Sequence, residues 1–237
     1  MRVQLEGLSK SFPGVRAVDS VSLDFESGKL YALVGENGAG KSTLMKLLYG
    51  MLPPDEGRIL IDGEPVRFRN PQDAIARGIG MVHQHFMLVD TLSAAENVVL
   101  GAEPLRRGLL DREAARRAVR DHAERFHLDL DPDAPMESLS VGEAQRVEIL
   151  RVLYRGAELL IFDEPTGVLT PQESRFLFEI LRRFVGEGKT VILITHKLDE
   201  VMAISSRVTA IRHGEVAGEV ATSDTSPREL AHLMVGR

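Results

Sequence analysis

One stretch decides the fold: Gly35-Glu36-Asn37-Gly38-Ala39-Gly40-Lys41-Ser42-Thr43, which matches the phosphate-loop spacing G-x-x-x-x-G-K-[ST]. The apolar residues 30–34 before it read as a strand, and residues 44–49 after it read as a helix. Glycines at three positions allow a tight turn that brings backbone N–H groups to phosphate oxygens at the start of that helix. The alternative is a glycine-rich turn with a chance lysine, and the strand and helix on either side argue against it. The sequence therefore predicts a nucleoside triphosphate site.

The residues of this loop have distinct expected roles. The Lys41 side chain is expected to reach the β- and γ-phosphates, and the Ser42 hydroxyl to complete the ligand shell of a Mg²⁺ ion. Nucleotide binding is assigned to the following loop residues: Gly35, Asn37, Gly38, Ala39, Gly40, Lys41, Ser42 and Thr43.

Composition narrows the class of protein. A chain of 237 residues can form one large α/β domain or two small ones. Its net charge of −6 argues weakly against broad nucleic-acid binding, and the absence of cysteine excludes disulfides and thiolate metal sites. Residues 1–6 lack the apolar core of a signal peptide, and no apolar run approaches the ~20 residues that cross a bilayer. We expect a soluble, cytoplasmic protein.

Strands and helices alternate along most of the chain, which predicts a largely parallel sheet. Two N-terminal segments, residues 3–8 and 18–25, alternate apolar and polar residues as half-buried antiparallel strands do. A hairpin is expected from residues 58–61 and 66–68, turning at Asp62-Gly63. Residues 90–153 show helical patterns without strong strand signals, and we expect them to form a helical insertion in the α/β core.

A second constellation lies at residues 159–164, an apolar strand that ends in two carboxylates. In phosphate-loop enzymes an aspartate at such a strand end holds Mg²⁺, which suits Asp163. Glu164 then lies where its carboxylate can accept a proton from an attacking water. The alternative is a strand that becomes polar as it reaches the surface, and the upstream phosphate loop favours the catalytic interpretation.

A third constellation is Leu139-Ser140-Val141-Gly142-Glu143. Ser140 and Glu143 have the spacing of a capping box. That pattern does not explain Gly142, because glycine costs about 1 kcal/mol inside a first helical turn. A glycine there suits a helix end that an anion approaches closely, so we predict that this helix start receives a γ-phosphate.

The order and spacing of these motifs resemble the ATP-binding subunits of ABC transporters over essentially the whole chain. The resemblance is carried by the phosphate loop, Gln84, residues 139–143, Asp163-Glu164 and His196. It implies an α/β fold of the phosphate-loop NTPase type, with a mostly parallel core sheet, an N-terminal antiparallel β subdomain and an inserted helical subdomain. The implied division is a core of residues 1–89 and 154–237 and a helical subdomain of residues 90–153, within a single ATPase domain.

The sequence of residues 163–173 looks like that of the sugar and nucleoside importer branch of the ABC transporters. Within this branch, residues 83–88 resemble the nucleoside importers. Members of this branch often carry two nucleotide domains in one polypeptide, and the chain resembles the first of them. Two alternatives stay open: the front half of a longer protein, and a naturally single unit.

By this resemblance, two domains face head to tail and enclose two ATP molecules with Mg²⁺, each site joining one phosphate loop to the other copy's Ser140, Gly142 and Glu143. Gln84 is expected to contact Mg²⁺ and the attacking water, and His196 the γ-phosphate. Phe12 occupies the place of the aromatic that stacks on adenine, with a core phenylalanine as the alternative. His83 and His85 are interpreted as ordinary surface or core residues.

One position departs from the family pattern. Thr170 stands where an aspartate is usual, and a threonine can still cap the helix that begins at Pro171. The lost charge predicts a weaker linkage across the dimer interface.

The resemblance implies the following partners: transmembrane permease subunits, a substrate-binding protein reached through them, and a second ATPase domain, either an identical copy or a related one. No nucleic acid is expected, and the protein is expected on the inner face of the cell membrane. One rival function is a soluble ABC ATPase that acts on nucleic acid or ribosomes, and its usual basic or coiled-coil insertions are absent from this sequence. A second rival, a phosphate-loop kinase, has no use for the helix start at Ser140.

Overall fold

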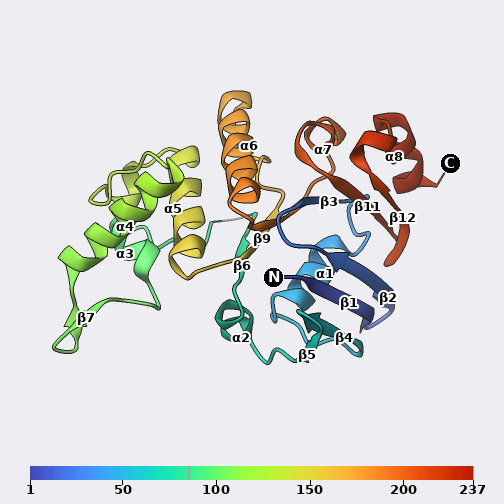
Figure 1. The fold of residues 1–237 in the computed structure, drawn as a ribbon, viewed down its shortest axis with the longest axis horizontal. Coiled ribbons are helices and arrows are strands. Elements are labelled where there is room, and N and C mark those ends of the chain that lie inside the picture. The colour runs from blue at the N-terminus through green and yellow to red at the C-terminus, as the bar shows by residue number, and fades with distance from the viewer. Residues whose placement is uncertain (85, 237) are drawn as a thin grey trace.

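Two large sheets, a two-stranded hairpin and a group of helices make up the structure, a computed structural model that describes residues 1–84 and 86–236 (Figure 1). The N-terminal sheet is antiparallel, with strand order β2-β1-β4-β5. Its strands are β1 (Val3–Phe12), β2 (Val15–Phe25), β4 (Glu56–Ile61) and β5 (Glu64–Val66). The predicted antiparallel β part is therefore confirmed, and both N-terminal strands are longer than expected.

The second sheet is the predicted, mostly parallel one, with strand order β12-β11-β3-β10-β9-β6. Neighbouring strands run parallel except for β12, which pairs antiparallel with β11 at one edge. Its strands are β3 (Leu30–Val34), β6 (Ile79–Val82), β9 (Leu159–Asp163), β10 (Thr190–Ile194), β11 (Arg207–Arg212) and β12 (Glu215–Ala221). Four of the parallel strands, β3, β10, β9 and β6, are entirely buried, which explains their unbroken apolar sequences.

Helices cover both faces of the parallel sheet. In Figure 1, α6, α7 and α8 lie on one face, and α1 lies between the other face and the antiparallel sheet. The bounds are α1 (Lys41–Leu48), α2 (Pro71–Ala76), α6 (Pro171–Gly186), α7 (Leu198–Ile204) and α8 (Pro227–Val235). Asn70 caps α2, because its side chain accepts a hydrogen bond from the Asp73 N–H.

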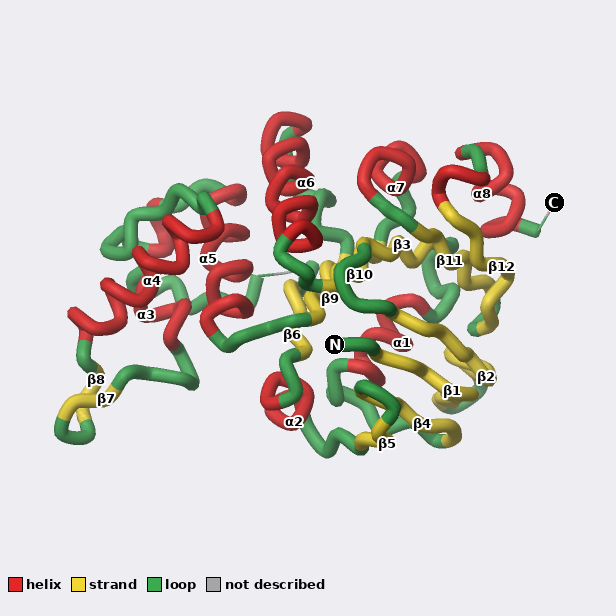
Figure 2. The backbone as a smooth tube through the Cα atoms, viewed as in Figure 1, coloured by secondary structure: helices red, strands yellow, loops and turns green. Residues whose placement is uncertain are grey.

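The segment expected to be helical projects to one side of the sheets (Figure 2). It contains α3 (Ala94–Val99), α4 (Arg112–Phe126), a 3-10 turn (Met136–Ser138) and α5 (Val141–Tyr154). It also contains a short hairpin of β7 (Leu105–Arg106) and β8 (Leu109–Leu110), which the sequence did not predict. The reason is the turn, Arg107-Gly108, in which both residues have positive φ, 54° and 81°. Arginine is rarely chosen for that conformation, so the usual hairpin signal is missing.

A second local prediction was also wrong. The return strand of the hairpin at residues 58–68 was expected at Val66–Phe68, and it runs instead from Glu64 to Val66. Asp62 and Gly63 have φ of 50° and 85°, so the predicted turn has two residues and the strand resumes directly after it.

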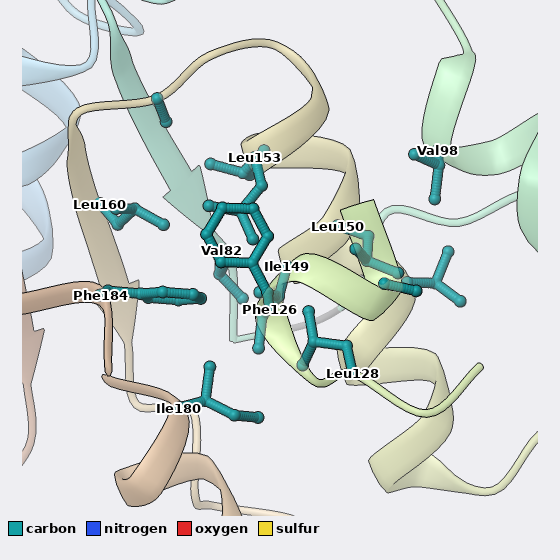
Figure 3. Close-up of a cluster of buried hydrophobic side chains, with 14 of the residues drawn as sticks. Val82, Val98, Phe126, Leu128, Ile149, Leu150, Leu153, Leu160, Ile180 and Phe184 are labelled. Atoms are coloured by element: carbon teal, nitrogen blue, oxygen red, sulfur yellow. The ribbon is translucent and has the colours of Figure 1, made fainter. Parts of the chain in front are cut away.

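The helical segment shares its hydrophobic core with the parallel sheet. Figure 3 shows Phe126 of α4 and Phe184 of α6 among leucines and valines from α5, β6 and β9. The two rings meet edge to face, with centroids 5.5 Å apart and planes at 85°. Helices α4 and α5 therefore pack on the core directly, while the division of the chain into subdomains at residues 90 and 153 stays a prediction.

The carboxyl ends of β3, β10, β9 and β6 meet at one edge of the parallel sheet, because these strands are neighbours and run in the same direction. Each of these strands is followed by a segment that contains predicted site residues. Within the described residues, no helix has the length and apolar character needed to span a bilayer.

Candidate functional site

The phosphate loop joins β3 to α1 in the predicted strand–turn–helix order. Gly35 and Gly40 have positive φ of 155° and 107°, and an added Cβ on either would lie 2.2 Å from a backbone carbonyl oxygen. Only glycine fits these two positions. Gly40 is the N-cap of α1 and provides no side-chain cap, and among residues 1–84 and 86–236 we find no hydrogen bond from the first N–H groups of α1, which can therefore bind an anion.

Lys41 is folded back into the loop. Its ammonium donates to the carbonyl oxygens of Gly35, at 2.8 Å, and Glu36, at 2.9 Å, and the residue is 5% exposed. Burial lowers the pKa of Lys41, and the nearby carboxylates of Glu164 and Asp163 oppose that shift. The loop is thus held in a bent shape by the residue expected to contact phosphate.

Ser42 and Asp163 come together across 121 residues of sequence. The Ser42 hydroxyl donates to the Asp163 carboxylate at 3.2 Å. Asp163 is 7% exposed, and burial raises the pKa of its carboxyl group against the hydrogen bond from Ser42. A hydroxyl and a carboxylate oxygen are ligands that Mg²⁺ prefers, so this pair fits the predicted ion. No group of three or more His, Asp or Glu side chains suited to a metal occurs among the described residues.

Glu164 and His196 lie beside each other at the same edge. The His196 Nδ1 atom is 3.3 Å from the Glu164 Oε1 atom. Glu164 has φ of 47°, an uncommon conformation for a residue with a side chain, and its N–H donates to the Ile194 carbonyl at 3.0 Å. Strained backbone of this kind is often found at functional sites. The geometry therefore places the predicted proton acceptor and the predicted γ-phosphate ligand together.

Gln84 is less closely connected to the other candidate site residues. It follows β6, whose Val82 is level with Phe162 of β9, so the topology places it at the catalytic edge of the sheet. Its side chain is exposed, and among the described residues no hydrogen bond joins it to Ser42 or Asp163. Its assignment to Mg²⁺ stays a prediction.

Gln84 lies between two histidines, within the segment of residues 83–88 that resembles nucleoside importers. His83 is half-buried, with its ring edge-on to that of Tyr49 at 6.0 Å between centroids, and burial lowers the pKa of its imidazole. His85 lies outside the described residues.

Phe12 ends β1 opposite Val15 and is 39% exposed, so the alternative of a core phenylalanine is wrong. The same hairpin approaches the phosphate loop, since the Ala17 carbonyl lies against Gly40. This placement is compatible with stacking on a base, which stays a prediction.

Ser140 is the exposed N-cap of α5, and the predicted capping box with Glu143 is present. The Ser140 hydroxyl accepts from the Glu143 N–H at 3.3 Å and donates to the Glu143 carboxylate at 2.7 Å. These hydrogen bonds from Ser140 lower the pKa of Glu143. Among the described residues, no hydrogen bond or ion pair joins residues 139–143 to the phosphate loop.

Gly142 has a packing role that sequence reasoning missed. A Cβ at this position would lie 2.5 Å from the Oε1 atom of Glu173, in the first turn of α6. Glu173 also completes a capping box with Thr170, so the predicted cap of α6 is confirmed. Hydrogen bonds from Thr170 lower the pKa of Glu173, and the Gly142 N–H contributes to the same shift. The start of α5 therefore rests against the start of α6.

Two further carboxylates make contacts near the site that were not predicted from the sequence. Glu148 is fully buried, accepts from the Met87 N–H at 2.6 Å and pairs with Arg151 at 3.0 Å. Arg151 also donates to the Met87 carbonyl at 2.6 Å, so α5 binds both backbone groups of Met87. The second, Glu200, accepts hydrogen bonds from Thr166, two residues after Glu164, and from Thr195, which precedes His196. An acidic residue on an otherwise apolar stretch of α5 was the available signal for Glu148.

A family model described as ABC transporter matches residues 18–167. The nucleoside import ATP-binding protein NupA of Lactococcus lactis subsp. cremoris is 48% identical over 235 residues, which cover 99% of this chain and 46% of that protein. The guanosine import ATP-binding protein NupO of Bacillus subtilis is 51% identical over 235 residues, with 99% and 46% covered.

A third relative, the ribose import ATP-binding protein RbsA of Hahella chejuensis, is 44% identical over 237 residues, with 99% and 47% covered. The chain thus spans about half the length of these relatives. Among solved structures, a nucleotide-free ATP-binding cassette shares the fold, with a TM-score of 0.86 at 23% identity and full coverage of both chains. A dimeric ATP-binding cassette in a post-hydrolysis state, bound to ADP and phosphate, matches with a TM-score of 0.79 at 27% identity, covering 93% of this chain and 98% of that one.

Proposed function

The chain belongs to the ABC transporter family, and from this premise we propose that it binds and hydrolyses ATP to power an importer of nucleosides or sugars. The observation that carries the proposal is the meeting of the phosphate loop, Asp163, Glu164 and His196 at one edge of the parallel sheet. The nucleoside, guanosine and ribose import functions in the names of its relatives support the substrate class.

The proposed reaction is attack of water on the γ-phosphate of ATP. The free N–H groups of α1 bind the phosphates, and Lys41 exchanges its carbonyl partners in the loop for phosphate oxygens. Glu164 accepts the proton of the attacking water, while the bond between the γ-phosphorus and the β–γ bridging oxygen breaks. His196, beside Glu164, donates to the γ-phosphate. Most of the rate enhancement comes from this positioning and from electrostatic stabilisation.

Ser42 and Asp163 would hold the Mg²⁺ ion, with Gln84 as the proposed third contact. When bound, Mg²⁺ neutralises charge on the phosphate oxygens. The close approach of Ser42 to Asp163 supports this assignment.

A second copy, or a second domain of the same family, is proposed to complete each site. The support is the exposed position of Ser140 at the start of α5, with no hydrogen bond to the chain's own phosphate loop found in the described part of the chain. The similar dimeric cassette supports a paired arrangement. In this proposal Ser140, Gly142 and Glu143 approach the partner's ATP, and Ser140 releases its hydrogen bond to Glu143 when it does so.

Permease subunits in the membrane, and through them a substrate-binding protein, are the proposed partners, with the ATPase on the cytoplasmic face. The test is ATP hydrolysis by the purified chain with Mg²⁺, together with affinity purification from cells. Hydrolysis that Lys41→Ala abolishes, and co-purification of membrane permease subunits, would support the proposal. Co-purification of ribosomes or nucleic acid, without a permease, would favour the rival function.

A further inference from the structure

Two loops carry the proposed catalytic pair, and each has a buried threonine next to it. The loop after β9 contains Glu164 and, two residues later, Thr166; the loop after β10 contains Thr195 followed by His196. Both threonines are 2% exposed. A buried hydroxyl needs a hydrogen-bond acceptor, and both threonines find theirs on the same residue.

That residue is Glu200, in the first turn of α7. Its Oε1 atom accepts from the Thr166 hydroxyl at 2.7 Å, and its Oε2 atom accepts from the Thr195 hydroxyl at 3.1 Å. The carboxylate thus spans the two loops, one oxygen for each. Its side chain is 12% exposed, so these bonds lie largely out of water.

Lys197 closes the same network. Its ammonium lies 3.2 Å from Glu200 and donates to both the carbonyl and the hydroxyl oxygen of Thr166 at 3.1 Å. The Lys197 N–H also donates to the Thr195 hydroxyl oxygen at 3.1 Å. The buried carboxylate is therefore paired with a cation, and each threonine oxygen accepts as well as donates.

We propose that Glu200 is a positioning residue that holds the loop of Glu164 and the loop of His196 in register with each other. The inference rests on the proposed function, since it concerns the same reaction. The 3.3 Å approach of His196 to Glu164 depends on the relative placement of the two loops. Besides the two Lys197 bonds to Thr166, the Glu164 N–H donates to the carbonyl of Ile194, the last residue of β10, which also links the two segments.

A neighbouring residue provides a matched control. Asp199 also lies in the first turn of α7, is exposed, and forms no hydrogen bond or ion pair that we find within the described residues. Its removal takes the same charge from the same helix start without touching either loop. Any effect of Glu200 that exceeds that of Asp199 therefore belongs to the network and not to the helix dipole.

The experiment compares Glu200→Ala, Glu200→Gln and Asp199→Ala in the full chain. It measures kcat and KM for Mg²⁺-ATP hydrolysis, equilibrium affinity for a fluorescent ATP analogue, and Tm. We expect Glu200→Ala to lower kcat at least tenfold while ATP-analogue affinity changes less than twofold, because the phosphate loop is untouched. Glu200→Gln, which keeps one acceptor oxygen and the side-chain volume, should recover part of that loss, and Asp199→Ala should stay within twofold of the wild type.

The positioning role is tested by whether kcat falls while the affinity for the ATP analogue is kept. An unchanged kcat in Glu200→Ala, or equal losses of kcat and nucleotide affinity, would overturn the positioning role. If Glu200→Ala fails to fold, Glu200→Gln carries the same test, with a lowered kcat at normal affinity expected. A wild-type chain that folds and binds the analogue but hydrolyses no ATP would instead count against the proposed function itself.

Discussion

Replacing Gly40 with alanine tests whether the phosphate loop is built as the structure indicates. Gly40 has φ of 107°, and a Cβ there would lie 2.2 Å from the Ala17 carbonyl oxygen and 3.4 Å from the Cα atom of Gly214. The substitution therefore adds backbone strain and a clash with a neighbouring strand. Gly63 provides a control, because it has φ of 85° and no atom lies within 4 Å of its added Cβ.

The magnitudes follow from these contacts. Positive φ costs a residue with a side chain about 1–2 kcal/mol, so Gly63→Ala should lower the free energy of unfolding by about that amount. Gly40→Ala should lose the same amount and about 1–3 kcal/mol more for overpacking. Relief of the clash requires a shift of about 1 Å in the loop, and a misplacement of about 1 Å at a site can cost about 100-fold in function.

Urea unfolding and equilibrium binding of ATP measure both effects. We expect Gly40→Ala to unfold more easily than Gly63→Ala and to bind ATP about 100-fold more weakly than the wild type, a loss in line with such a displacement. Gly63→Ala should bind ATP normally. If Gly40→Ala binds ATP with wild-type affinity and is no less stable than Gly63→Ala, the inferred cradle is wrong.

Three further predictions concern the site and its support. Glu164→Gln should retain ATP binding, lower the hydrolysis rate at least about 100-fold and accumulate an ATP-bound dimer on size exclusion; normal turnover would refute its role as base. Ser140→Ala should lose hydrolysis while the affinity of a single copy for ATP stays unchanged, and an equal loss of that affinity would place Ser140 in the chain's own site. Glu148 has a pKa raised above its ordinary 4.5 by burial, so the folded chain holds the Glu148 proton more tightly than the unfolded chain does. As pH rises from about 4.5 through the raised folded pKa, the unfolding free energy of the wild type should therefore fall relative to that of Glu148→Gln, and urea unfolding at several pH values showing a constant or opposite difference would contradict this.

Local sequence signals predicted much of this molecule, for identifiable reasons. The phosphate loop was recognisable because glycine spacing, strand and helix all lie within about twenty residues of each other. The capping boxes at Ser140 and Thr170 were equally accessible, since the partners lie three residues apart. Roles for Asp163 and Glu164 could be predicted because both stand at the end of an apolar strand. The end of a parallel strand determines at which edge of the sheet these residues lie.

Features that depend on tertiary neighbours were not accessible in the same way. Glu148 binds Met87, which lies 61 residues away in the sequence, and Glu200 binds Thr166, which lies 34 residues away. No local sequence pattern therefore predicts either contact. The packing of Gly142 against α6 is of the same kind: its sequence context indicated a phosphate receptor, and only the fold shows Glu173 beside it. The missed hairpin at Arg107-Gly108 has a different cause, a turn conformation that arginine seldom adopts.

The central claim is that each ATP site is completed by a second copy, and disulfide trapping between copies tests it most directly. The chain has no cysteine, so cysteines introduced singly, as Asn37→Cys in one batch and Ser140→Cys in another, can form a mixed disulfide only between two molecules. Both batches would carry Glu164→Gln to preserve the ATP. The account predicts a cross-linked mixed dimer in the presence of ATP and little without it. A mixed dimer that fails to form with ATP, or that forms equally well without it, would contradict the claim.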